Sequence, residues 1–112
     1  MPRRSVGQKL AQRVLSSGKS VSGLFFRAVF DQFPGEESRS SVIVSKKVAK
    51  TAPARNRIKR RTRAILAGCL PDLTPGSTVL LFARPNARTA THEDLKKDVT
   101  SLVHLIIGKH TK

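Results

Sequence analysis

The sequence of 112 residues contains few acidic, aromatic and sulfur-containing residues. Only 7 Asp and Glu stand against 22 Lys and Arg, which gives a formal net charge of +15. Trp and Tyr are absent, and the single cysteine, Cys69, has no partner for an internal disulfide. The longest apolar run, residues 79–83, is far shorter than the roughly 20 residues of a membrane span. The basic N-terminus lacks an apolar signal core, so we expect a cytoplasmic protein without membrane contact.

The side chains that usually carry catalysis or bind metals are also sparse and scattered. His92, His104 and His110 share no zinc-ligand spacing with one another or with Cys69. The seven acidic residues form no cluster suited to metal-assisted chemistry, and no glycine-rich phosphate loop is present. The sequence therefore predicts no catalytic residue, no metal site and no cofactor bound by the chain itself.

The most informative segment is residues 46–63, which contains nine Lys and Arg and no Asp or Glu. Such a concentration of cations favours a polyanionic partner, because Lys and Arg displace the counterions condensed on nucleic acid. A solvated helix face is the simplest alternative for any one of these cations. A membrane-surface peptide would need one broad amphipathic helix, whereas this chain alternates helical and strand patterns. The nine residues are Lys46, Lys47, Lys50, Arg55, Arg57, Lys59, Arg60, Arg61 and Arg63.

The periodicity of apolar residues predicts one small α+β domain over residues 1–112, with an ordered core at about 8–108. In chain order the expected elements are a helix at 5–17, strands at 20–30 and 39–45, a helix at 55–67, a strand at 78–84, and a helix from 91 or 92 to 107. Gly23 divides the first strand if it forms a bend, which gives the order α-β-β-β-α-β-α.

Three of these segments have an apolar face at helical spacing. In the helix predicted at residues 5–17, Leu10, Val14 and Leu15 fall on one side of the helix. Gly68 and Pro71 are expected to end the basic helix, and Pro53 to precede it. The buried stripe predicted for the basic helix is Ile58, Thr62, Ile65, Leu66 and Cys69, and that of the last helix is Leu95, Val99, Leu102, Val103 and Ile106.

The motif Ser-Lys-Lys-Val at residues 45–48, followed by Arg-Asn-Arg-Ile-Lys-Arg at 55–60, resembles the signature of the bacterial ribonuclease P protein subunit. The segments Gly-Lys-Ser-Val at 18–21 and Leu-Phe-Ala-Arg-Pro at 81–85 resemble the flanking parts of that family. The similarity covers roughly residues 8–107. It implies a sheet of about four strands with a left-handed βαβ crossover around the basic helix, although the general rule for such units predicts a right-handed one.

The resemblance also implies a function. In that family the RNA subunit, with Mg²⁺, removes the 5′ leader of precursor tRNA, and the protein binds both the catalytic RNA and the leader. On this basis the chain is expected to be the accessory subunit of an endoribonuclease, monomeric within the ribonucleoprotein. The residues expected to bind RNA are Arg55, Asn56, Arg57, Lys59, Arg60, Arg63, Lys46, Lys47 and Lys50.

The leader cleft implied by the resemblance lies between the first helix and the sheet. Its expected residues are Phe25, Arg27, Val29 and Leu15. Where the family commonly places aromatic side chains on the first helix, this sequence has Ala11 and Leu15. We therefore expect leader binding to depend more on charge, through Arg27, Lys46 and Lys47, and less on base stacking.

Two other classes of protein share the charge and size of this chain. A small structural RNA-binding protein of the ribosomal type is the main alternative, but it has no reason to carry the Lys-Lys and Arg-Asn-Arg-Ile-Lys-Arg arrangement. A DNA-binding regulator would present side chains such as Asn, Gln or Ser to base edges, often from a dimer. The basic helix here consists mainly of cations suited to phosphate.

Overall fold

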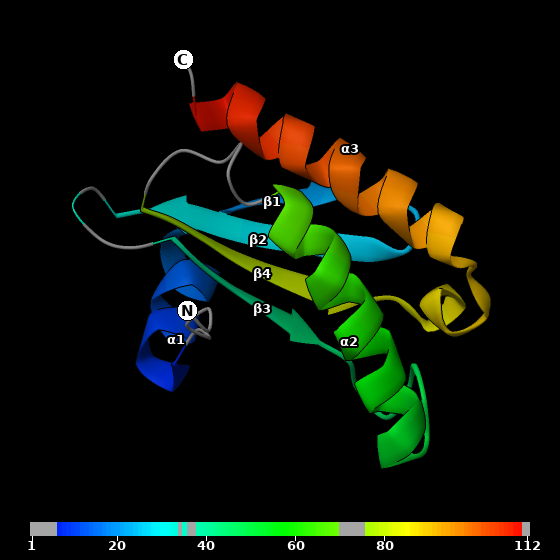
Figure 1. The fold of residues 1–112 in the computed structure, drawn as a ribbon. Coiled ribbons are helices and arrows are strands. Elements are labelled where there is room, and N and C mark those ends of the chain that lie inside the picture. The colour runs from blue at the N-terminus through cyan, green and yellow to red at the C-terminus, as the bar shows by residue number, and fades with distance from the viewer. Residues whose placement is uncertain (1–6, 34, 36–37, 70–75, 111–112) are drawn as a thin grey trace.

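The structure is a computed structural model that describes residues 7–33, 35, 38–69 and 76–110. It contains a four-stranded mixed sheet, three α-helices and a short 3-10 helix, in the predicted order α-β-β-β-α-β-α (Figure 1). The elements are α1 (Gln8–Ser17), β1 (Lys19–Ser22), β2 (Phe26–Gln32), β3 (Arg39–Ile43), α2 (Ala52–Cys69), β4 (Ser77–Ala83), η2 (Pro85–Thr89) and α3 (His92–His110). No helix in these described ranges is long and apolar enough to span a bilayer.

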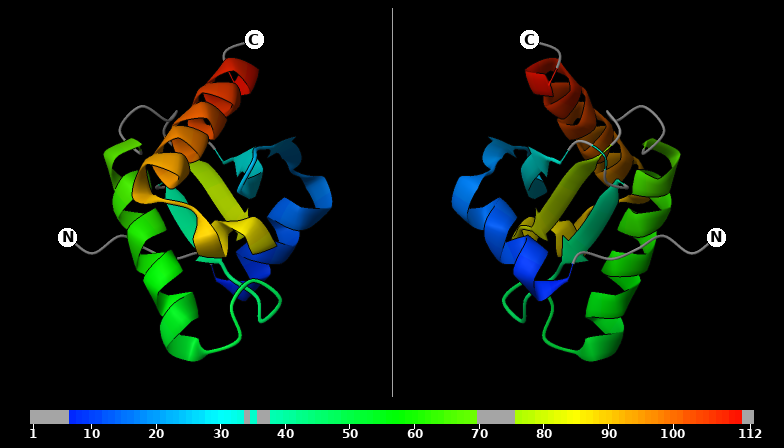
Figure 2. Two further views of the ribbon diagram at one scale, coloured as in Figure 1. Left: turned by 90° about the vertical axis from the view of Figure 1, so that its right-hand side faces the viewer. Right: turned by 90° about the vertical axis from the view of Figure 1, so that its left-hand side faces the viewer.

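The strands lie in the order β1-β2-β4-β3, with β4 antiparallel to β2 and parallel to β3. Helix α2 joins the two parallel strands and forms a βαβ crossover with them. In Figure 1 both strands run from left to right with β4 above β3, and the side view in Figure 2 places α2 in front of the sheet. This arrangement makes the crossover left-handed, as the family resemblance implies and against the general rule.

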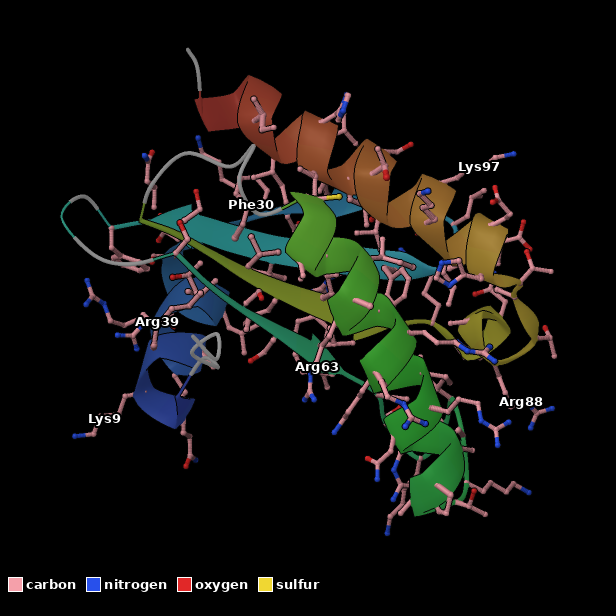
Figure 3. All side chains as sticks on the ribbon, viewed as in Figure 1. Lys9, Phe30, Arg39, Arg63, Arg88 and Lys97 are labelled. Carbon is pink, nitrogen blue, oxygen red and sulfur yellow. The ribbon has the colours of Figure 1, made fainter. Side chains whose placement is uncertain are left out.

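The larger hydrophobic core lies between the sheet and helices α2 and α3. Phe26, Ala28 and Phe30 occupy every second position of β2, so their side chains all point into this core, as expected for a strand with one face on it. Figure 3 shows Phe30 between the sheet and the helices. The predicted apolar positions of α3 are buried here: Leu95, Val99, Leu102, Val103 and Ile106.

Helix α1 covers the opposite face of the sheet, where a smaller core forms. Val14 of α1 packs against Val29 of β2 and Leu80 of β4, and Leu10 and Ala11 border this cluster. Leu15 does not belong to it, because its side chain is 50% exposed. The prediction that Leu15 shares the buried side of the helix with Leu10 and Val14 is therefore wrong.

Helix α2 is longer at both ends than its sequence pattern predicts. It begins at Ala52, so Pro53 lies inside the first turn, where a residue without an N–H group loses no helical hydrogen bond. It ends at Cys69 and thus includes Gly68, while Pro71 lies outside the described residues. The predicted stripe is confirmed at Ile58, Thr62, Ile65 and Leu66, which are all buried, and Cys69 is half-buried beside the larger core.

The turn between β1 and β2 is attached to α3 by one buried carboxylate. Asp98 accepts hydrogen bonds from the backbone N–H groups of Leu24 at 2.8 Å, Phe25 at 3.0 Å and Phe26 at 3.0 Å. A Cβ atom at Gly23 would lie only 2.5 Å from Asp98 Oδ1, so this close approach requires glycine. Asp98 therefore fixes how the β1–β2 hairpin sits against α3.

Candidate nucleic-acid interface

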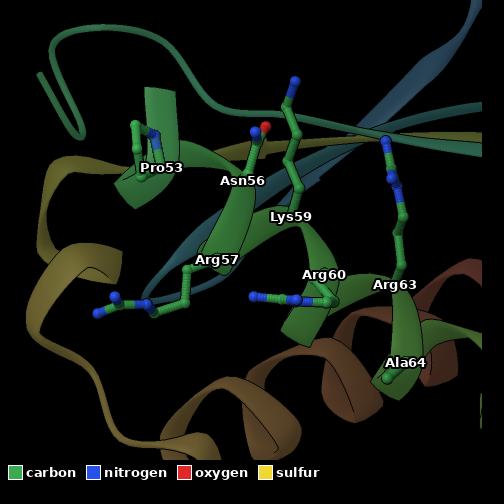
Figure 4. A pocket seen from close by; sticks show the side chains of 7 residues that line it. All are labelled: Pro53, Asn56, Arg57, Lys59, Arg60, Arg63 and Ala64. Carbon is green, nitrogen blue, oxygen red and sulfur yellow. The ribbon is translucent and has the colours of Figure 1, made fainter. Parts of the chain in front are cut away.

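The exposed side of α2 carries two rows of polar and cationic side chains. Helical spacing of three and four residues places Asn56, Lys59 and Arg63 in one row and Arg57 and Arg60 in the other. In Figure 4, Arg57 and Arg60 extend to one side of the helix, whereas Lys59 and Arg63 extend in a different direction. Between the rows lies an open hollow of about 750 Å³. Its lining residues are Pro53, Asn56, Arg57, Lys59, Arg60, Arg63 and Ala64.

The chemistry of this hollow suits a phosphate backbone. Guanidinium groups can bind phosphate oxygens with two parallel hydrogen bonds, and the Asn56 amide can both donate to and accept from a ribose or base edge. The first turn of α2 contains no acidic residue to offset the positive end of the helix dipole. The charge of this surface is therefore of one sign along its length.

The loop from β3 to α2 adds three exposed lysines. Its backbone turns tightly, because the N–H groups of Val48 and Ala49 both donate to the carbonyl oxygen of Ser45, at 3.0 and 3.3 Å. The Val48 and Ala49 side chains are buried in the larger core, which anchors the loop. Lys46, Lys47 and Lys50 are exposed on this anchored turn.

Arg55 lies in a different environment from the other cations of α2. Its side chain is half-buried, and its Nη1 donates to the carbonyl oxygens of Ala49 at 3.1 Å and Lys50 at 3.0 Å. Arg57, by contrast, is exposed, as are Arg60 and Arg63. The structure thus separates Arg55, which contacts the loop, from the cations that border the hollow.

A second candidate surface lies on the α1 face of the sheet. Backbone pairing places Ser22, Arg27, Phe82 and Ile43 side by side in one row across all four strands. The Arg27 guanidinium lies over the Phe82 ring, 5.4 Å from its centroid. Arg27 is exposed and Phe82 is half-buried, so this pair offers both a cation and an aromatic ring at the surface.

The residues predicted for the leader cleft fall into different environments. Arg27 and Val29 do lie on the α1 face, but Val29 is only 3% exposed because α1 packs over it. Leu15 is exposed on α1 itself. Phe25, which was expected to line the same cleft as Arg27, does not lie on the α1 face, since it precedes β2 and packs against the larger core on the α3 side.

Sequence reasoning missed two aromatic residues on the α1 face. Phe82 lies in the strand predicted at 78–84 and Phe33 lies just after the strand predicted at 20–30, and both are half-buried beside the smaller core. The Arg13 guanidinium lies 4.7 Å from the Phe33 ring centroid, so each ring is paired with an arginine. The alternation of Thr78, Leu80 and Phe82 along β4 was the signal that could have assigned Phe82 to this face.

Cationic side chains also project from several other elements of the fold. Figure 3 shows Arg63 projecting from α2, Lys9 from α1, and Arg88 near the η2 end of the molecule. Within the described ranges, no group of three or more His, Cys, Asp or Glu side chains comes together as a potential metal site. A small α+β domain with an acid-free cationic helix has the features expected of a protein that binds a polyanion.

Comparison with known proteins identifies the family. The family model described as Ribonuclease P matches residues 7–106. A ribonuclease P protein component from Lactobacillus johnsonii is 36% identical over 98 residues, covering 85% of this chain and 76% of that protein. The chain therefore belongs to the ribonuclease P protein family.

Two further comparisons agree with this assignment. A ribonuclease P protein component from a Cyanothece species is 40% identical over 68 residues, a match that covers 61% of this chain and about half (52%) of that protein. The RNase P protein of Staphylococcus aureus has the same fold, with a TM-score of 0.80 at 22% identity, over 94% of this chain and 95% of that one. The α+β architecture and the order of its elements are thus those of a known RNase P protein.

Proposed function

We propose that this protein binds the catalytic RNA of ribonuclease P through α2 and the β3–α2 loop. The observation that supports this assignment is the acid-free exposed face of α2, where Arg57, Arg60 and Arg63 border an open hollow. The cleavage chemistry is assigned to the RNA subunit with its Mg²⁺. This chain then contributes RNA binding to an endoribonuclease that matures the 5′ end of tRNA.

The experiment is cleavage of a precursor tRNA by a bacterial ribonuclease P RNA at low Mg²⁺, with and without the protein. The wild-type chain should restore cleavage, and the Arg57→Ala/Arg60→Ala double variant should restore it less. The variant should also bind the RNA with a weaker salt dependence, by roughly 0.7–0.9 in log K per log [salt] for each lost phosphate contact. Tight RNA binding without restored cleavage by the cognate RNA would favour a structural RNA-binding protein of the ribosomal type.

We further propose that the α1 face of the sheet holds the 5′ leader of precursor tRNA. The row containing Arg27 and Phe82 supplies a cation for phosphate and a ring on which a base can stack. Base–aromatic stacking typically contributes about 1–3 kcal/mol per base, so Phe82 also gives this surface a contribution independent of charge. The lysines of the β3–α2 loop remain the other candidate contacts for the leader.

This second proposal is tested by comparing precursor tRNA with mature tRNA as ligands of the assembled holoenzyme. Phe82→Leu and Arg27→Gln should each reduce the preference for the precursor and leave binding of mature tRNA unchanged. Ser22→Ala is the matched control, because Ser22 lies in the same row but has neither ring nor charge. An unchanged preference for precursor in both variants would contradict the placement of the leader on this face.

A further inference from the structure

Arg55 is set apart from the other cations of α2 by its position on the helix. It precedes Ile58 by three residues and Thr62 by seven, so it lies on the same side of α2 as the buried stripe, one turn earlier. At this end of the helix that side meets the β3–α2 loop, as the bonds from Arg55 Nη1 to Ala49 and Lys50 show. The hollow between the two rows is lined by seven residues, and Arg55 is not one of them.

The bonds made by Arg55 determine what its guanidinium can still do. An Nη nitrogen carries two hydrogens, and the two carbonyl oxygens at 3.1 and 3.0 Å accept both of them. While the loop is held, the edge formed by Nη1 and Nη2 therefore cannot bind a phosphate in bidentate fashion. The two bonds instead fasten the end of the loop to the start of α2.

We propose that Arg55 is a positioning residue for RNA binding, which holds the β3–α2 loop so that Lys46, Lys47 and Lys50 are ordered beside α2 before RNA arrives. This inference rests on the proposed function. Burial of Val48 and Ala49 anchors the middle of the loop, and Arg55 anchors its end. Fixing the backbone that carries three cationic side chains reduces the entropy lost when they bind.

The first arm of the test uses the free protein. Arg55→Met keeps most of the aliphatic stem and removes the donors, and Arg61→Met is the matched control at an exposed position of the same helix. Hydrogen exchange of the Val48 and Ala49 amides should become about tenfold faster in Arg55→Met, since charged hydrogen bonds hold the loop, and should stay unchanged in Arg61→Met. Unchanged exchange at these two amides in Arg55→Met would overturn the proposal.

The second arm measures affinity for a bacterial ribonuclease P RNA in a double-mutant cycle. The loop background is Lys46→Gln/Lys47→Gln/Lys50→Gln. Arg55→Met should weaken binding about fivefold in the wild-type background and less than about twofold in the loop background, because the residue acts through those lysines. An equal loss in both backgrounds would show direct phosphate binding by Arg55 and overturn the proposal, as would a loop background that binds like wild type.

The two arms keep this inference separate from the proposed function. If Arg57→Ala/Arg60→Ala binds the RNA as tightly as wild type, docking through α2 is wrong, and that result does not depend on Arg55. The exchange measurement requires no RNA and still reports whether Arg55 holds the loop. The proposed function and the role of Arg55 therefore fail through different measurements.

Discussion

The contact between Asp98 and the β1–β2 turn leads to a quantitative prediction about stability. Asp98 is 7% exposed, and its carboxylate accepts three backbone N–H groups, at 2.8, 3.0 and 3.0 Å. Replacement by alanine removes all three acceptor contacts. The N–H group of Phe26 is left buried, whereas those of Leu24 and Phe25 are only partly buried and can bond to water.

The expected loss follows from these three environments. An unsatisfied buried donor costs about 1–3 kcal/mol, and a hydrogen bond that water can replace contributes about 0.5–1.5 kcal/mol. With one donor of the first kind and two of the second, Asp98→Ala should lower the free energy of unfolding by about 2–6 kcal/mol. Urea unfolding should be followed by circular dichroism, because the chain contains no Trp or Tyr for fluorescence.

The control uses the close approach of Gly23. A Cβ at this position would lie 2.5 and 2.6 Å from the two Asp98 oxygens, so Gly23→Ala should be strongly destabilising in the wild type. Its cost should fall in the Asp98→Ala background, where those oxygens are gone. Lys97→Ala, an exposed substitution on the same helix, should change stability little. A loss below about 0.5 kcal/mol for Asp98→Ala would refute the reasoning, since surface substitutions reach that size.

Two other predictions concern stability. The Oγ1 of Thr62 is fully buried and has no hydrogen-bond partner in the described part of the chain, so Thr62→Val should raise the free energy of unfolding by about 1 kcal/mol. Urea unfolding checks this, and a destabilised variant would indicate that the hydroxyl is paired in solution. Added salt should stabilise the free protein, because it screens repulsion among the α2 cations, while it weakens RNA binding. Thermal unfolding at two salt concentrations tests this, and a lower midpoint at high salt would contradict it.

The parts of the fold that follow from local patterns could be predicted from the sequence. Ile58, Thr62, Ile65 and Leu66 repeat at helical spacing, and their burial against the sheet and α3 confirms the stripe. Gly23 between two strand-like segments indicated the β1–β2 turn, which the structure confirms. Such features depend on neighbours within a few residues, which is why one sequence was sufficient to predict them.

Features that depend on distant residues could not be predicted in this way. Asp98 bonds to a turn more than 70 residues earlier in the chain, and nothing near it in the sequence indicates that partner. The left-handed crossover contradicts the general rule and was expected only from the family resemblance. On the α1 face, Phe82 meets Arg27 only because β2 and β4 are adjacent, so the aromatic part of that surface was missed.

The arrangement of α2 explains how one helix can serve both the core and an RNA surface. Five pairs of its cations are three or four residues apart, and each like-charged pair destabilises a helix by about 0.2–0.5 kcal/mol. These pairs are Arg55–Lys59, Arg57–Arg60, Arg57–Arg61, Lys59–Arg63 and Arg60–Arg63.

Burial of the stripe from Ile58 to Leu66 offsets this repulsion in the free protein, and the carbonyl bonds of Arg55 offset it at the first turn. A bound phosphate backbone would offset the repulsion among the exposed cations, because they would then face negative charge. The charges that weaken the isolated helix are thus the ones that would strengthen its complex with RNA. Affinity for RNA and stability of the free protein should therefore respond in opposite directions when a cation of the exposed rows is neutralised.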